Sequence, residues 1–561
     1  MSTIMTALNE TVRLGALSEV QTQYIVLFFH RYILTTPTHF VNNASWTFAL
    51  KVKMQYLRGD TFPPNMLEYD EILEKIGYGK TQWILLLISG LLTITSVAAQ
   101  QTMSIVVIAS RCEFDTTEAE MGVMMAAYVA GVFLSTYIWG YVCDAIGRRK
   151  VLLYGTFSSC ALLFVLMFVT SVWLFNIINL LSGISLGGVS AALYAYLSEF
   201  NIPRHRAVAI NYSTMFVSVT AIYVPATAWA VLSYDWSIPI VGDFVFRPWR
   251  LLMLLTLLPG VIGGLVLLHY PESPKYLLSQ DKEDQAINAV DWISKFNRGL
   301  SITQVLSCNE IRLKPEIQTE ENILSNSKGW HIITNIARAT KPLFHKPHGF
   351  NFVLCNVAVF CMFFSSNGIQ LWFPEIVNRS SNEGNQSSTV CEILSSPEQG
   401  QIKSMNSTNI CSDAISTNTY IDNMIVGVAF LVGFLIQGVI LNPIGRKNVL
   451  MAALALSIFS GLLLHFVSNP IVVLILFCLV ILLPGLSISI MLGAIVDLVP
   501  TNLRGKAVSL CMSLGRLGII AATNLMGIIL IQYCTMTFAL LSVILIVCFV
   551  VVYYLPIRNS A

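Results

Sequence analysis

The sequence has little charge. Only 11% of its 561 residues are Asp, Glu, Lys or Arg, whereas a soluble domain carries roughly a quarter. The 33 basic residues nearly cancel the 31 acidic ones, so the cationic excess that a nucleic-acid-binding surface needs is missing. This scarcity excludes an ordinary soluble enzyme and predicts no nucleic acid among the partners.

The usual signatures of an enzyme are also missing. The string Gly79-Lys80-Thr81 lacks the earlier glycine of a phosphate-binding loop, because position 74 is Glu. No nucleophile, acid pair or metal-ligand cluster stands out along the chain. The sequence therefore predicts a protein that is not an enzyme and needs no cofactor and no metal.

Long apolar stretches take the place of charge, since 55% of the residues are hydrophobic. Twelve runs are long enough to cross a bilayer as helices. The runs are Gln82–Ile108, Met121–Val142, Val151–Thr170, Val172–Leu197, Val208–Leu232, Leu251–His269, Phe352–Pro374, Met424–Leu441, Val449–Phe466, Ile471–Val496, Val508–Tyr533 and Met536–Tyr554. The predicted fold class is an all-α membrane protein with 12 transmembrane helices in two six-helix halves.

Basic residues gather in alternate loops, which predicts that both termini are cytoplasmic. The first eighty residues lack the layout of a signal peptide, and Tyr69–Lys80 is expected to form a short amphipathic helix that ends at Gly77 and lies on the membrane. The predicted parts are a cytoplasmic extension (1–80), the two halves (81–270 and 350–555), a central cytoplasmic loop (271–349), a glycosylated outer loop (375–420) and a cytoplasmic tail (556–561).

The outer loop carries three glycosylation sequons, and such acceptors are usable only on the lumenal or extracellular side. The acceptor residues are Asn378, Asn385 and Asn406. The same loop contains Cys391 and Cys411, which share an oxidising compartment and are candidates for a disulfide, with Cys112 as a competing partner.

Two motifs recur at one spacing. Asn442 follows Asp144 by 298 positions within matching Gly-rich loops, and Asp497 follows Glu199 by the same 298 positions. A duplicated six-helix half is the plan of many secondary transporters, which handle substrate between the halves.

The loop motif G-x-x-x-D-x-x-G-R-R/K resembles the signature of the major facilitator superfamily, which implies twelve helices and alternating access. Gly140 is expected to let two helices approach closely, and Gly147 to permit the turn. The acidic and basic residues are interpreted as gating groups that open and close as the halves rock, against the alternative that they are only inside-positive loop charges. The gating candidates are Gly140, Asp144, Gly147, Arg148, Arg149, Glu199, Arg206, Asn442, Gly445, Arg446, Asp497 and Arg504.

Other strings indicate a branch of this superfamily. The segment Pro271–Leu277 is similar to a string of sugar and organic-ion transporters, while Gly77–Trp83, Ser198–Phe200 and Trp372–Glu375 resemble the synaptic vesicle glycoprotein 2 family. The outer loop of about 45 residues is far shorter than the lumenal domain of the vertebrate members of that family. The resemblance places the protein in a vesicle or plasma membrane as a multi-pass integral protein.

One charge falls deep in a predicted span. Arg516 is either a counter-charge for an anionic substrate or gating partner, or a structural arginine satisfied by helix-end carbonyls or a hydrated cleft. Polar and aromatic residues in other spans are further candidates for the substrate cavity, although such residues more often satisfy a neighbouring helix. These candidates are Gln100, Gln101, Asn367, Gln370, Tyr223, Trp229 and Trp372.

Acidic residues that the family usually carries in its first span are replaced by Ser96 and Ala99. The leading hypothesis is therefore a transporter of a small organic solute, with an anion as one alternative, that is not proton-coupled. The rival hypothesis is a transport-inactive protein similar to synaptic vesicle glycoprotein 2 that acts in vesicle trafficking or exocytosis. The expected partners are membrane lipid and the solute, with vesicle-trafficking proteins under the rival hypothesis.

Overall fold

The computed structural model describes residues 66–234, 236–241, 244–306, 312–313, 340–345, 348–382, 389–395, 414–499, 503–530 and 532–557. The chain divides into two units. In the smaller unit, β1 (Met66–Leu67) pairs in parallel with β4 (Arg312–Leu313). The larger unit, Asp70–Ser307 with Pro315–Ala561, contains all the membrane-spanning helices described below.

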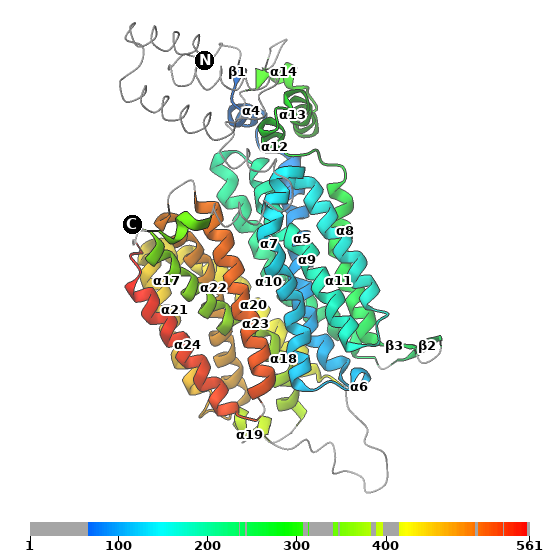
Figure 1. Ribbon diagram of the computed structural model, residues 1–561, viewed down its shortest axis with the longest axis vertical. Coiled ribbons are helices and arrows are strands. Elements are labelled where there is room, and N and C mark those ends of the chain that lie inside the picture. The colour runs from blue at the N-terminus through cyan, green and yellow to red at the C-terminus, as the bar shows by residue number, and fades with distance from the viewer. Residues whose placement is uncertain are drawn as a thin grey trace, which may run out of the picture. The chain divides into compact units, whose positions relative to one another are not determined.

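The described residues contain 12 helices that are long and apolar enough to cross a membrane, which confirms the predicted fold class. Six form the first half, shown from blue to green in Figure 1. They are α5 (Lys80–Ala109), α7 (Glu118–Ile146), α8 (Arg148–Leu166), α9 (Val172–Glu199), α10 (Pro203–Leu232) and α11 (Pro248–Leu267). Pro203 and Pro248 each begin a helix, at the position where a missing N–H costs nothing.

The second half repeats the plan, from yellow-green to red in Figure 1. Its first span is built from α17 (Gly349–Phe363), the π-turn η2 (Phe364–Gly368) and α18 (Ile369–Asn382). The other spans are α20 (Thr417–Ile444), α21 (Arg446–Leu463), α22 (Pro470–Leu498), α23 (Arg504–Ile529) and α24 (Cys534–Tyr554). The seventh span runs to Ser381 instead of Pro374, and the eighth begins at Thr417 instead of Met424, so both reach into the expected outer loop.

Short elements join the spans at two ends. The motif end carries the turns at Gly147 and Gly445, with α4 (Tyr69–Ile76), α12 (Pro274–Ser279), α13 (Glu283–Arg298), α14 (Ile302–Leu306) and η1 (Lys341–Phe344). The loop end carries α6 (Arg111–Phe114), α19 (Val390–Ser395) and a hairpin of β2 (Ile238–Val241) and β3 (Phe244–Phe246). Figure 1 shows these two ends at the top and bottom of the bundle.

Helix α4 has the predicted amphipathic character and ends before Gly77, whose φ is +78°. Its placement on a membrane surface is not what the structure shows. The apolar residues Ile72 and Leu73 are fully buried within the protein, and Arg298 Nε of α13 donates to Ile76 O at 2.6 Å. The apolar face is therefore already covered by protein.

Glycines bring helices together inside and between the halves. An added Cβ at Gly183 of α9 would collide with the Tyr128 carbonyl of α7, as expected for close packing. Between the halves, α7 packs against α23 and α10 against α20. A Cβ at Gly122 would lie 2.7 Å from Thr523 O, and one at Gly527 would lie 2.7 Å from Glu118 O. Both contacts are at the loop end, so the halves meet closely there.

Candidate functional site: a closed loop end above a central polar cavity

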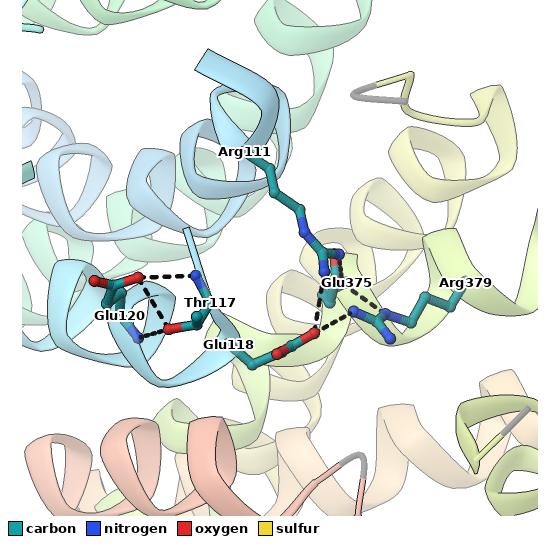
Figure 2. Close-up of polar contacts among 6 residues, drawn as sticks. All are labelled: Arg111, Thr117, Glu118, Glu120, Glu375 and Arg379. Atoms are coloured by element: carbon teal, nitrogen blue, oxygen red, sulfur yellow. Dashed lines mark hydrogen bonds and ion pairs between the residues drawn. The ribbon is translucent and has the colours of Figure 1, made fainter. Parts of the chain in front are cut away.

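Four charged side chains join the halves at the loop end. Arg111 Nη1 of α6 lies 3.7 Å from Glu375 Oε1 of α18, and Arg379 Nη2 of α18 lies 3.3 Å from Glu118 Oε1 of α7. Within each half, Arg111 Nη2 is 3.0 Å from Glu118 Oε1 and Arg379 Nε is 2.7 Å from Glu375 Oε1. Figure 2 shows the four side chains converging from both halves. We call these residues the loop-end cluster.

Local structure holds the cluster in place. Thr117 caps α7, because its N–H donates to Glu120 Oε2 at 2.9 Å and its hydroxyl accepts from Glu120 N, as Figure 2 also shows. This cap fixes Glu118 as the first residue of the helix. The Glu375 side chain is only 4% exposed, and a carboxylate so nearly buried needs both of its arginine partners.

A small cavity lies between the halves below this cluster. It has a volume of about 20 Å³, which is room for about one water molecule. Two of the predicted residues, Gln101 of α5 and Gln370 of α18, line it together with Asn423 of α20 and Ser104. Amide and hydroxyl groups from both halves therefore share its lining with apolar side chains of α5, α10 and α20.

Arg516 of α23 reaches across to the other half. Its Nη1 donates to Thr136 Oγ1 of α7 at 2.8 Å, and the hydroxyl groups of Tyr128 and Tyr194 lie within electrostatic range of the guanidinium. Thr136 Oγ1 is its only hydrogen-bond acceptor in the part of the chain that the structure describes. No described carboxylate forms an ion pair with Arg516, so its charge faces only neutral groups.

The other predicted cavity residues are not gathered around this cavity. Tyr223 OH donates to Leu255 O at 2.7 Å, and Trp372 Nε1 donates to Thr523 O at 3.1 Å, so both bind neighbouring helices. Trp229 is 41% exposed, and Gln100 is absent from the cavity lining. Asn367 lies in the π-turn η2, a distortion that is common at functional sites.

The motif end has a separate charge cluster in each half. In the first half, Arg148 Nη2 lies 3.0 Å from Asp144 Oδ1, and its Nε lies 3.3 Å from Glu199 Oε1. In the second half, Arg446 pairs with Asp497. Arg446 lies 298 residues after Arg148, and Asp497 lies 298 residues after Glu199. The repeat in the sequence is therefore also a repeat of ion pairs.

The remaining basic residues of the two motifs satisfy helix ends. Arg149 Nη2 donates to Leu268 O at 2.6 Å, and Lys447 Nζ donates to Tyr553 O at 2.8 Å. Both carbonyls lie where the last helix of a half ends, where a cation is favourable. Arg206 Nε donates to Asn201 O at 3.0 Å, and Arg504 Nε donates to Val499 O at 3.3 Å.

Arg206, one of the gating candidates, pairs with a residue outside that set. Its Nη2 lies 2.6 Å from Asp70 Oδ1 of α4, which Lys275 Nζ also approaches at 3.1 Å. Tyr276 OH, close to the same end, donates to Ala145 O at 2.9 Å. Burial, together with the neighbouring Glu272 carboxylate, raises the pKa of the Tyr276 hydroxyl, which keeps it a donor.

The glycines of the motif behave differently from one another. Gly147 and Gly445 have φ values of +108° and +88°, and a Cβ at Gly147 would collide with Glu272. Gly140 does not bring two helices together, contrary to expectation, because nothing lies within 4 Å of an added Cβ there. The same holds for Gly438 in the second half. These open positions lie at the motif end, away from the close contacts of the loop end.

The predicted Cys391–Cys411 disulfide is wrong, whereas the glycosylation sites stay predictions. Cys391 forms its disulfide with Cys534 at the start of α24 and not with Cys411, because α19 folds back against α24. Cys112 is also disulfide-bonded. Asn378 is only 7% exposed, and its amide binds Ala414 O and Ser416 N, so it is a poor glycan acceptor. Asn385, Asn406 and Cys411 lie outside the described residues.

Sequence reasoning missed the loop-end cluster and Asp422. Glu375 and Arg379 fall within the expected outer loop (375–420). Their four-residue spacing is nevertheless typical of an ion pair on a helix. Asp422 lies in α20, half-buried and without an ion-pair partner among the described residues. It was missed because the span was expected to begin at Met424.

A bundle of twelve spanning helices in two similar halves, with polar groups between them, defines the class of secondary membrane transporters. The family model described as Major Facilitator Superfamily matches residues 85–390 and 415–561. The chain belongs to the Major Facilitator Superfamily.

Similar proteins agree with this assignment. Synaptic vesicle glycoprotein 2A of Rattus norvegicus is 25% identical over 55% of this chain, and synaptic vesicle glycoprotein 2B of Homo sapiens is 24% identical over 56%. The matches span 43% and 48% of the length of these relatives. The inward-open xylose transporter XylE from E. coli has a TM-score of 0.60 at 13% identity and covers 85% of this chain and 97% of its own chain, which shows the fold.

Proposed function

We propose that this protein transports a small organic solute by alternating access, with the solute held between the halves near Arg516. The observation that carries the proposal is the Arg516–Thr136 contact between the two halves, because the guanidinium there forms no ion pair with a carboxylate among the described residues. A cation in a spanning helix costs several kcal/mol unless water, a dipole or an anion stabilises it. An anionic group on the solute supplies the negative counter-charge for Arg516 that no described protein group provides.

The loop-end cluster, with the uncrowded Gly140 and Gly438 at the motif end, supports a state that is closed at the loop end. Basic residues in the loops of the motif end favour a cytoplasmic location for that end, so this state faces the cytoplasm. Opening the loop end requires breaking the Arg111–Glu375 and Arg379–Glu118 contacts. Gly140 and Gly438 are then free to accept closer packing at the motif end.

Uptake into proteoliposomes with a panel of organic anions and cations tests the proposal. We expect saturable uptake of an anion by the parent protein. Arg516→Gln should lower that uptake by roughly 10- to 100-fold, because a hydrogen bond to a charged group contributes about 1.5–3 kcal/mol. Arg516→Lys should retain part of it, since the charge remains while two-point recognition is lost.

The matched control is Thr136→Val, which removes the neutral partner and leaves the charge in place. It should reduce uptake less than Arg516→Gln does. Equal thermal stability of Arg516→Gln and parent, with unchanged uptake, would exclude Arg516 from the site. Uptake of cations only would remove the anionic solute from the proposal.

A second candidate function is a role in vesicle membranes without transport. The similarity to synaptic vesicle glycoproteins 2A and 2B favours it, as does the replacement of the family's membrane acids by Ser96 and Ala99. Absence of uptake for every compound in the panel, from a folded and correctly inserted protein, would favour this alternative.

A further inference from the structure

The β2–β3 hairpin is a feature that the transport proposal does not use. It connects the end of α10 at Leu232 to the start of α11 at Pro248. The strands are antiparallel, with Ile238 opposite Phe246 and an irregularity between Pro239 and Val241. Figure 1 shows the hairpin projecting sideways from the loop end of the first half, beyond the outline of the helices.

Strand β3 and its connection to α11 are held against the bundle. Arg250 is fully buried, pairs with Glu113 of α6 and donates to Val169 O at 3.3 Å. Its guanidinium also lies 4.5 Å from the centre of the Phe244 ring of β3. Trp249 Nε1 donates to Glu113 Oε2 at 2.9 Å. These contacts hold the start of β3, and the beginning of α11 that follows it, against the bundle.

The apolar residues described on the β2 side of the hairpin are exposed. Tyr234 is 70% exposed, and Ile238 and Ile240 are each 54% exposed. Trp236 stacks on Phe246 with ring centres 5.9 Å apart. Contiguous exposed apolar residues on a rigid projection indicate a surface that something else covers.

The hairpin continues a surface that already faces lipid. Phe244 stacks on Phe168, just beyond the end of α8, with ring centres 6.1 Å apart, and Phe168 contacts Phe164. Phe164 and Val165 are 47% and 50% exposed on the outside of α8, and Phe168, just after its end, is 48% exposed. The side chains of the hairpin therefore extend the apolar outer face of α8 at the level where the helices end.

Tyrosine and tryptophan side chains are enriched at the boundary between lipid headgroups and acyl chains. The hairpin carries both of them beside isoleucine. We infer that the β2–β3 hairpin inserts Tyr234, Ile238 and Ile240 into this interfacial layer of the bilayer beside α8. A lipid surface fits better than water because the exposed apolar area of the two isoleucines is unfavourable in contact with water. The inference stands independently of whether the protein transports.

Fluorescence quenching in nanodiscs tests the inference. Ile240→Cys is labelled with bimane in discs of phosphatidylcholine that contain a shallow doxyl-labelled phosphatidylcholine, one protein copy in each disc. Val165→Cys on the outside of α8 is the lipid-facing control, and Ala119→Cys at the exposed start of α7 is the water-facing control. The parent protein, treated in the same way, gives the background from native cysteines.

We expect the doxyl lipid to quench the label of the Ile240→Cys variant as strongly as that of Val165→Cys and several-fold more than that of Ala119→Cys. The label of Ile240→Cys should also be protected from aqueous iodide, and a label at Tyr234→Cys should behave in the same way. Quenching by iodide with no lipid quenching at either hairpin position would overturn the inference. Protection that develops only when discs contain two copies would assign the surface to a second chain, and would also overturn it.

Discussion

At the scale of single residues, two motif glycines that look alike in the sequence have different physical roles. Gly147 has a φ of +108° and is crowded by Glu272, whereas Gly140 lies in a helix with open space around it. A side chain at position 147 would strain the backbone and collide with Glu272, whereas a side chain at position 140 would have no atom within 4 Å of its Cβ. The sequence pattern alone cannot separate them, because it records spacing and not backbone conformation.

This difference predicts opposite stabilities for two alanine variants. Gly147→Ala should lower the melting temperature of the purified protein, because the backbone there, with φ 108° and ψ 152°, is essentially restricted to glycine and costs another residue about 1–3 kcal/mol. Gly140→Ala should leave it unchanged or raise it slightly, because alanine is the better helix former. Thermal unfolding in the same detergent measures both. Equal destabilisation by the two substitutions would contradict the assignment.

At the scale of elements, the sequence predicted the twelve spans well and their loop-side ends poorly. Apolar runs define the buried middle of a helix, but the polar ends of α18 and α20 carry no such signal. Those ends contain Glu375, Arg379 and Asp422, so the loop-end cluster could not be predicted from hydrophobicity. The 298-residue repeat, by contrast, correctly predicted matching charge positions, because the duplicated halves retain the same helix ends.

The extended α18 changes which sequons we expect to be used. Glycan should be attached at Asn385 or Asn406 and not at Asn378, because the Asn378 side chain is buried and hydrogen-bonded. Mass spectrometry of peptides from the purified protein, before and after enzymatic deglycosylation, distinguishes the three sites. Glycan on Asn378 would show that α18 ends earlier than the structure places it.

Asp422 lies near the loop end of α20. Its position bears on whether transport is coupled to a proton gradient. The cavity between the halves is lined by amide, hydroxyl and apolar groups and has no carboxylate among its lining residues, so we expect transport to be insensitive to a pH gradient between about pH 6 and 8. Asp422→Asn should retain uptake and its pH profile in proteoliposomes. A proton-driven solute current that Asp422→Asn abolishes would identify Asp422 as a coupling group and defeat this expectation.

At the scale of the whole molecule, the two halves are joined by charges at one end and carry separate charge clusters at the other. The Major Facilitator fold was predictable from the repeat, the loop motif and the twelve spans. The sequence did not predict which end of the bundle is closed. Closure depends on contacts between residues more than 250 positions apart, such as Arg111 with Glu375. The disulfide between Cys391 and Cys534 escaped prediction for the same reason, since its partners are 143 positions apart.

The most direct test of alternating access measures distances at both ends of the molecule by pulsed electron spin resonance in nanodiscs. One label pair, at Ala119→Cys and Ser380→Cys, spans the loop end, and the other, at Ile146→Cys and Ile444→Cys, spans the motif end. We predict that Arg379→Gln, which removes a contact between the halves, lengthens the loop-end distance and shortens the motif-end distance, while Arg379→Lys changes both less. Distances that stay fixed at both ends, or that lengthen together, would contradict the account.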